Sequence, residues 1–274
     1  MTILTYIVWD MNPDITTIPF LGIPLRWYGV LFALGFMLGQ LIVSFIYRKE
    51  GKPSGDVDSL TIYVIVATLL GARLGHVLFY DPVFYFENPS KIFATWEGGL
   101  ASHGGGIGVL IGLYLFARKT KVPYLWILDR VAIATCLLGC LIRLGNLTNS
   151  EMVGIPSTLP WAFIFTAVDN VPRHPAQLYE AIYCFLLFVF LFWTWYKRRE
   201  QLKNGFLFGW FLVILFSLRF VDEFFKINQV EFEEGMILNM GQWLSVPFVL
   251  AGIAILIAIR TKKEKAPTLH RDAA

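Results

Sequence analysis

Several ionisable side chains of this chain lie inside or at the end of long apolar stretches. Among them are three arginines, Arg73, Arg143 and Arg219. An Arg at membrane depth costs roughly 2.5–3.5 kcal/mol on insertion scales, so each is a functional candidate. A guanidinium fork matches the oxygens of a phosphate. Three such groups near many glycines indicate binding of an anionic phospholipid headgroup, with Asn146 and Asn149 as hydrogen-bond partners for its hydroxyls.

His103 is the candidate for proton transfer, because histidine is the side chain that ordinarily titrates near neutral pH. A histidine in a membrane helix can also be a structural hydrogen-bonder, and we interpret His76 in that way.

An alternative function is that of an intramembrane protease, which would need a Ser–His pair. Ser102 and His103 are adjacent, so on a helix they point about 100° apart and make a poor dyad.

Two carboxylates could instead neutralise the arginines internally. Glu223 stands four residues after Arg219, and Glu151 can reach Arg143 if the chain turns back. Such internal pairing is the alternative to ligand binding for Arg219 and Arg143. Tyr28, at the outer end of the first apolar stretch, has the alternative of being an aromatic residue of the membrane interface.

The composition requires that membrane helices position these groups. The 274 residues are 56% hydrophobic and only 16% charged, against about a quarter charged in soluble domains. The formal net charge of +3 is too small to indicate nucleic-acid binding. Since about 20 apolar residues cross a membrane, we expect an all-α integral membrane protein. About seven transmembrane helices are predicted, at residues 27–47, 58–80, 99–117, 123–146, 176–196, 206–225 and 242–260.

The third stretch is rich in glycine, which permits close approach between membrane helices.

The orientation of the chain in the membrane follows from the basic residues, because cytoplasmic loops carry the excess of Lys and Arg. Their distribution places the N-terminus outside and the C-terminus in the cytoplasm. The residues that follow the first, third, fifth and seventh stretches are Arg48, Lys49, Lys52, Arg118, Lys119, Lys121, Lys197, Arg198, Arg199, Lys203, Arg260, Lys262, Lys263, Lys265 and Arg271.

We expect one transmembrane domain over residues 1–260, with the external loop 147–175 as a small periplasmic element. Residues 161–167 of that loop have the pattern of a strand or an interfacial segment. Residues 261–274 form a basic cytoplasmic tail that we expect to be disordered. Because no basic residue precedes Arg26, no cleavable signal peptide is expected. The three cysteines are interpreted as small buried hydrophobes: Cys136, Cys140 and Cys184.

The depth of the charged groups favours one polar cavity open to the outside. Those of the second, fourth and sixth stretches lie in the last third of helices that run outward. His103 lies in the first third of a helix that runs inward. All therefore fall in the outer leaflet, and we expect no polar groups in the cytoplasmic half. A transporter or flippase for anionic phospholipids, the main alternative, would need polar groups through the whole membrane.

One segment carries a specific motif. Residues 143–154, Arg-Leu-Gly-Asn-Leu-Thr-Asn-Ser-Glu-Met-Val-Gly, resemble the signature GRxGNFxNxExxG of bacterial prolipoprotein diacylglyceryl transferases. Further matches lie at residues 26–29, 71–75, 98–105, 173–180, 219–225 and 240–247. The departures are Ile142 for the first Gly, Leu147 for the Phe, and Lys226 where an Arg often follows. None of them removes a charge.

The resemblance implies a transferase that moves the diacylglyceryl group of phosphatidylglycerol to the lipobox cysteine thiol of a preprolipoprotein. A thioether forms and glycerol phosphate leaves, which is the first step of bacterial lipoprotein maturation. The implied partners are phosphatidylglycerol and preprolipoprotein signal peptides with a lipobox cysteine, without a cofactor or a metal. The implied location is the bacterial cytoplasmic (inner) membrane, as a multi-pass protein whose active site faces the outer leaflet.

The resemblance also implies roles for individual residues. His103 would accept the thiol proton, while Arg143 and Arg219 would hold the phosphate and stabilise its leaving charge. No nucleophilic Ser or Cys is needed, since the nucleophile belongs to the substrate. The residues implied to bind phosphatidylglycerol are Arg143, Asn146, Glu151, Tyr28, Arg73, Asn149, Glu223 and Gly154.

Overall fold

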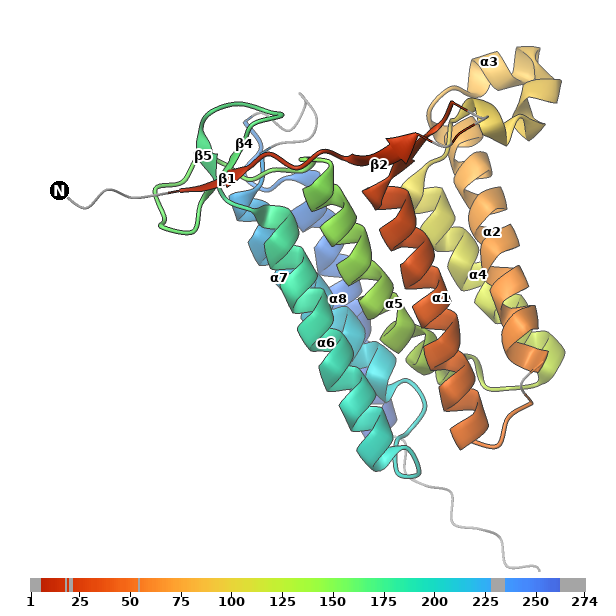
Figure 1. Cartoon of the computed structure of the whole chain (residues 1–274). Helices are drawn as coiled ribbons and strands as arrows, with labels where there is room; N and C mark the ends of the chain where they lie inside the picture. The colour runs from red at the N-terminus through yellow and green to blue at the C-terminus, as the bar shows by residue number, and fades with distance from the viewer. Residues whose placement is uncertain (1–5, 18, 20–21, 54, 228–234, 262–274) are drawn as a thin grey trace, which may run out of the picture.

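The computed structural model describes residues 6–17, 19, 22–53, 55–227 and 235–261, and within them the chain is mostly helical. Seven long helices stand side by side, with short strands at their upper end (Figure 1). The long helices are α1 Trp27–Lys49, α2 Gly55–Phe79, α4 Ser102–Thr120, α5 Tyr124–Thr148, α6 Ala176–Arg198, α7 Phe206–Asp222 and α8 Met240–Thr261. Between them lie the short helices α3 Pro82–Glu87, η1 Pro89–Phe93, η2 Thr95–Glu97 and η3 Glu223–Phe225.

One long helix overlaps each of the seven predicted stretches, which confirms the all-α class. Five of these helices, α1, α2, α5, α6 and α8, are long and apolar enough to cross a membrane. The other two are the glycine-rich α4 and the 17-residue α7. In the most apolar windows of α1 and α2 only 22% of the residues are buried within the protein. Their exposed faces are apolar, which indicates that lipid surrounds them and that the chain is a multi-pass membrane protein.

Helices α2 and α4 pack with their backbones in close contact, as the glycines of the third stretch predict. A Cβ atom on Gly75 would lie 2.8 Å from the Cα of Gly104, and one on Gly71 would overlap the carbonyl oxygen of Gly104. A Cβ on Gly108 would overlap the carbonyl of Ala67. This approach explains why a helix that glycine weakens in water is retained in a membrane protein.

Short strands tie the N-terminal segment to the loop between α5 and α6. Strand β1 (Ile7–Trp9) pairs in parallel with β4 (Phe163–Phe165), and β4 pairs antiparallel with β5 (Pro172–Arg173). The indole of Trp9 donates to the carbonyl of Leu147 at 3.0 Å, at the end of α5. A separate hairpin joins β2 (Asp14–Thr17) and β3 (Pro24–Arg26). The strand expected within residues 161–167 is confirmed, whereas the other strands were not predicted.

A polar network at the opposite end of the bundle corrects the expectation that this half carries no polar groups. Glu50, after α1, accepts two 2.8 Å hydrogen bonds from Arg130 of α5 and one of 2.9 Å from the indole of Trp126. Asp129 accepts the backbone N–H groups of Gly205 and Phe208, both at 2.8 Å, and so caps the start of α7. These groups bind one another and so join α1, α5 and α7. They do not form a polar path across the membrane. The tail predicted beyond residue 261 lies outside the described residues.

The close contact of α2 and α4 predicts different effects for two glycines of the same helix. Gly108→Ala should lower the free energy of unfolding by about 1–3 kcal/mol, because its Cβ meets backbone that can only move with the helix. Gly106→Ala should be neutral or stabilising, since nothing lies within 4 Å of its Cβ position. Thermal unfolding of the two variants in the same detergent compares them. Equal midpoints would contradict this packing.

Candidate active site

The motif segment turns sharply at the end of α5 and folds its carboxylate back onto the helix. Ser150 and Met152 have positive φ values of 54° and 56°, in the left-handed region that non-glycine residues rarely adopt. Between them, Glu151 accepts hydrogen bonds at 3.1 Å from the side-chain amides of both Asn146 and Asn149. The chain thus turns back as required, and three predicted site residues lie together.

Arg143 binds a different carboxylate from the one considered in the sequence. Its Nε lies 2.9 Å from Oε2 of Glu180 on α6, and its side chain is 15% exposed. It also donates to Oδ1 of Asn146 at 3.2 Å. Glu151 therefore reaches Arg143 only through Asn146. Gln177, one turn before Glu180, donates to the backbone carbonyl of Glu151 and fixes the turn to α6.

Glu180 also binds the cation that follows α7. Its Oε1 lies 2.7 Å from Nζ of Lys226, and both side chains are almost completely buried. Lys226 further pairs with Asp222 at 3.2 Å and with Glu223 at 3.1 Å. We call these five residues, Arg143, Glu180, Asp222, Glu223 and Lys226, the Glu180 cluster. It joins α5, α6 and α7 at one end of the bundle.

Arg219 stands at the edge of the Glu180 cluster. Its nearest carboxylate oxygen is Oε1 of Glu223 at 3.7 Å, too far for a hydrogen bond, and its side chain is 37% exposed. Glu223 is held from the other side by the amide of Asn239, at 3.2 Å, just before α8. The predicted pair of Arg219 and Glu223 is confirmed as a loose one, which leaves the guanidinium accessible.

Two further predicted residues pack tightly against this region. Gly154 forms an isolated bridge with Lys226 and donates its N–H to the carbonyl of His174 at 2.9 Å. A Cβ on Gly154 would lie 2.6 Å from the carbonyl oxygen of Phe225. The ring of Tyr28 covers Gly145, whose Cβ position is 2.8 Å from it. Gly154 and Tyr28 thus shape the site by contact with its backbone.

The loop above the site carries an ion pair and a neutral histidine. Hydrogen bonds from Arg173 hold the pKa of the partly exposed Asp169 carboxyl below its ordinary value. Burial lowers the pKa of His174, whose Nδ1 lies 3.1 Å from the hydroxyl of Tyr179. Burial therefore favours the uncharged form of His174. In that form it contributes no further cation to the end of the bundle where the Glu180 cluster lies.

Two predicted site residues are not joined to the Glu180 cluster. Arg73 uses all five of its N–H donors on backbone carbonyls, those of Lys91, Ile92, Ala94, Gly98 and Gly99. In this conformation it organises residues 91–99 and has no donor left for phosphate, so its role in lipid binding stays a prediction. His103 is exposed on the first turn of α4, with no hydrogen bond or ion pair to the described residues.

Sequence reasoning left Glu180, Asp222, Asn239 and Gln177 out of the candidate site. Glu180 had a usable signal, because a carboxylate five residues into an apolar span needs a buried partner. Asn239 had none, since it precedes its helix and reaches Glu223 across 16 residues. The three cysteines are buried, as predicted, and none contacts the Glu180 cluster through a hydrogen bond.

The Glu180 cluster predicts a large effect for removal of its central charge. Glu180→Gln should lower the free energy of unfolding by about 3–5 kcal/mol, because it leaves Arg143 and Lys226 with incomplete partners in a buried place. Glu200→Gln, whose side chain is 87% exposed, should change little. Unfolding in mixed detergent micelles measures both.

A double-mutant cycle then tests the pair directly. Glu180→Gln combined with Lys226→Met should cost about 0.5–3 kcal/mol less than the two single changes added together. Strictly additive losses would show that the two charges do not interact.

Comparison with known proteins identifies the family. A family model for prolipoprotein diacylglyceryl transferases matches residues 16–258. A phosphatidylglycerol–prolipoprotein diacylglyceryl transferase of Tolumonas auensis is 46% identical over 94% of this chain and 98% of its own length. Relatives with the same name from Porphyromonas gingivalis and Chlamydia trachomatis are 47% and 36% identical, over 94% and 93% of this chain and 96% and 99% of theirs. This chain belongs to the prolipoprotein diacylglyceryl transferase family.

Proposed function

We propose that this protein transfers the diacylglyceryl group of phosphatidylglycerol to the lipobox cysteine thiol of a preprolipoprotein. The observation that carries the proposal is the joining of the motif segment to Glu180 of α6 and Lys226 after α7. The names of the relatives, which specify phosphatidylglycerol and prolipoprotein, support the same substrates. No described contact favours the transport of lipid instead.

The reaction balances as a substitution at a glycerol carbon. The thiol loses its proton, the sulfur forms a bond to that carbon, and the bond from the carbon to the phosphate oxygen breaks. Glycerol phosphate leaves with the bonding electrons. The enzyme must therefore hold the phosphate, stabilise the charge that develops on it, and accept one proton.

Arg219 and Arg143 have different roles in the site, because one is loosely and the other tightly paired with a carboxylate. In their ordinary ionised forms, Arg143, Arg219 and Lys226 face four carboxylates, those of Glu151 and of the Glu180 cluster. An added phosphate is thus bound only where a cation is free of tight pairing. Arg219 meets that condition, because it is 37% exposed and 3.7 Å from its carboxylate. Arg143, fixed by Glu180 and Asn146, would present its remaining N–H groups in a constant direction.

We assign the acceptance of the thiol proton to His103. Its exposure and its lack of partners among the described residues leave both ring nitrogens accessible. It lies at the start of α4, at the same end of the bundle as the end of α5 (Figure 1). A thiolate formed there would approach the glycerol carbon from the side of α4.

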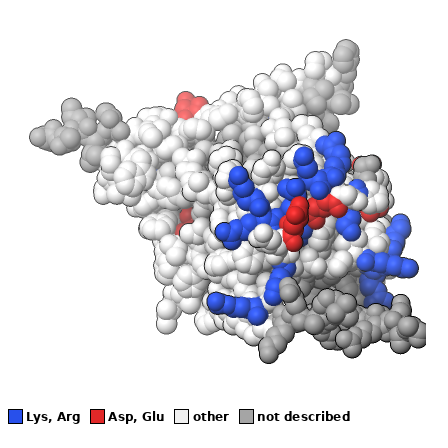
Figure 2. Space-filling model, turned by 90° about the horizontal axis from the view of Figure 1, so that it is seen from below, with Lys and Arg blue, Asp and Glu red and all other residues white. Residues whose placement is uncertain are grey.

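We propose seven spans, with α4 and α7 crossing the bilayer together with the five longer apolar helices. Lys and Arg gather at the lower end of the bundle, where α1, α4, α6 and α8 end (Figure 2). The positive-inside rule makes that end cytoplasmic. The N-terminus and the site then face the outer leaflet of the bacterial inner membrane, where phosphatidylglycerol and the signal peptide would arrive.

Activity should depend on the arginine charge and its fork geometry. Purified protein, phosphatidylglycerol and a peptide with a lipobox cysteine should yield thioether-linked diacylglycerol, detected by mass. Arg143→Ala should reduce the rate on the order of a hundredfold or more, since it removes phosphate stabilisation. Arg118→Ala, an exposed arginine at the opposite end of the bundle, is the matched control and should retain the rate. Folded wild-type protein that binds phosphatidylglycerol without transfer would favour a carrier.

Transfer should survive loss of every cysteine of the enzyme. Because the attacking sulfur belongs to the substrate, the triple variant Cys136→Ala, Cys140→Ala, Cys184→Ala should keep its activity within a few fold. His103→Gln should lose most activity at neutral pH. Activity abolished in the folded cysteine-free variant would imply a covalent intermediate on the enzyme. Full activity of His103→Gln would assign the proton to another group.

A further inference from the structure

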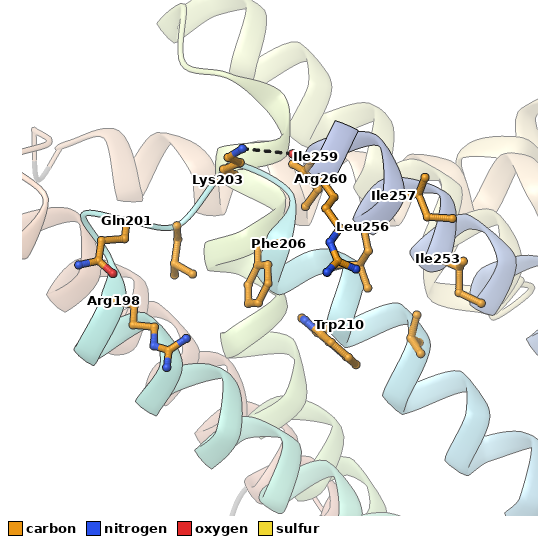
Figure 3. Close-up of a pocket in the computed structure, with 12 residues that line it drawn as sticks. Arg198, Gln201, Lys203, Phe206, Trp210, Ile253, Leu256, Ile257, Ile259 and Arg260 are labelled. Atoms are coloured by element: carbon orange, nitrogen blue, oxygen red, sulfur yellow. Dashed lines mark hydrogen bonds between the residues drawn. The ribbon is translucent and has the colours of Figure 1, made fainter. Parts of the chain in front are cut away.

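A cavity of about 670 Å³ lies at the end of the bundle opposite the Glu180 cluster. It is bounded by the end of α6, the connection to α7, the first turns of α7 and the end of α8. Three cations border it, Arg198, Lys203 and Arg260. In Figure 3, Arg198 lies on the α6 side and Arg260 on the α8 side, with Phe206 and Trp210 between them.

Among the residues that the structure describes, no acidic side chain pairs with the cations that border the cavity. No Asp or Glu is among its lining residues. Within the described part of the chain, the guanidinium groups of Arg198 and Arg260 have no ion pair or hydrogen bond. Lys203 makes one long hydrogen bond, at 3.4 Å, to the carbonyl of Ile259. The nearest acidic residue in sequence, Glu200, pairs weakly with Arg199 at 3.9 Å. Three cations that pair with no acidic side chain of the described residues fit an anionic ligand.

The interior of the cavity is apolar, which distinguishes the ligand from a free phosphate ion. Phe206, Trp210 and Val213 of α7 face Ile253 and Leu256 of α8. These residues run from the charged rim along the two helices toward the middle of the bundle. A ligand that fits both the charged rim and the apolar interior has an anionic head and a hydrocarbon chain. Basic pockets between membrane helices are known to take such lipid headgroups.

This place is remote from the proposed active site. Glu180 and Arg198 both lie on α6, and the 18 residues from one to the other span about 27 Å at 1.5 Å each. A lipid in the cavity could not contribute its glycerol carbon to chemistry at Arg143. We propose that the cavity binds an anionic phospholipid of the leaflet at this end as a ligand that is not consumed. Arg198, Lys203 and Arg260 hold its phosphate, and its acyl chain lies against α7 and α8.

Binding of cardiolipin to the full chain in detergent, followed by native mass spectrometry, tests the proposal. Cardiolipin is the anionic probe, and phosphatidylcholine, which also has a phosphate but no net charge, is its match. The pair Arg198→Gln, Arg260→Gln should weaken cardiolipin binding tenfold or more. Arg48→Gln, Arg118→Gln removes two exposed charges from the same end and should change it less than twofold. Arg198→Lys, Arg260→Lys should retain binding within threefold.

Three results would overturn the proposal. One is equal weakening by both glutamine pairs, which would mean a diffuse basic surface. Another is cardiolipin binding that is unchanged in the double variant Arg198→Gln, Arg260→Gln but lost in Arg219→Gln. The third is equal affinity for phosphatidylcholine. If the glutamine pair does not purify as a single species, Arg260→Gln against Arg118→Gln decides in the same way, with threefold weakening expected for Arg260→Gln alone.

Discussion

The position of one buried carboxylate determines how the ends of three helices meet. Glu180 lies between Arg143 and Lys226, at 2.9 Å and 2.7 Å, and its side chain is only 3% exposed. Glu180 is the carboxylate that pairs with Arg143 and the one that Lys226 approaches most closely, and an incompletely paired charge in such a place costs several kcal/mol. The motif turn after α5 and the segment after α7 are both attached to α6 through this group. The loop 149–175 then closes over them through Gly154 and its bridge to Lys226.

The rest of the bundle supplies a rigid frame for that arrangement. Glycine contacts fix α2 against α4, and with them the positions of Arg73 and His103. At the far end, Glu50 and Asp129 tie α1, α5 and α7 together through hydrogen bonds to Arg130 and to the start of α7. Buried polar groups thus occur at both ends. Those at the far end bind one another, whereas at the near end Arg219 is only loosely paired and His103 has no partner among the described residues.

Much of this could be predicted from the sequence, because long apolar runs determine helices almost directly. The small strands at residues 7–9 and 24–26 could not be predicted, since three residues carry too weak a pattern. Pairing was harder still. Arg130 binds Glu50, which lies 80 residues away in the sequence. Nothing in the sequence around Arg130 distinguishes it from a basic residue at the membrane interface. The sequence shows that Arg73 is costly to place in a membrane. Its five carbonyl acceptors, however, lie in a loop whose conformation cannot be predicted from residue spacing.

We propose that the Glu180 cluster and Arg219 form the phosphate-binding part of the site. An experimental structure with phosphatidylglycerol bound would test it most directly. We expect a lipid phosphate at hydrogen-bond distance, about 2.7–3.2 Å, from guanidinium nitrogens of Arg219 and Arg143, with the Arg143–Glu180 pair intact. A phosphate bound to Arg73, with its backbone carbonyls released and Arg143 and Arg219 out of reach, would contradict it.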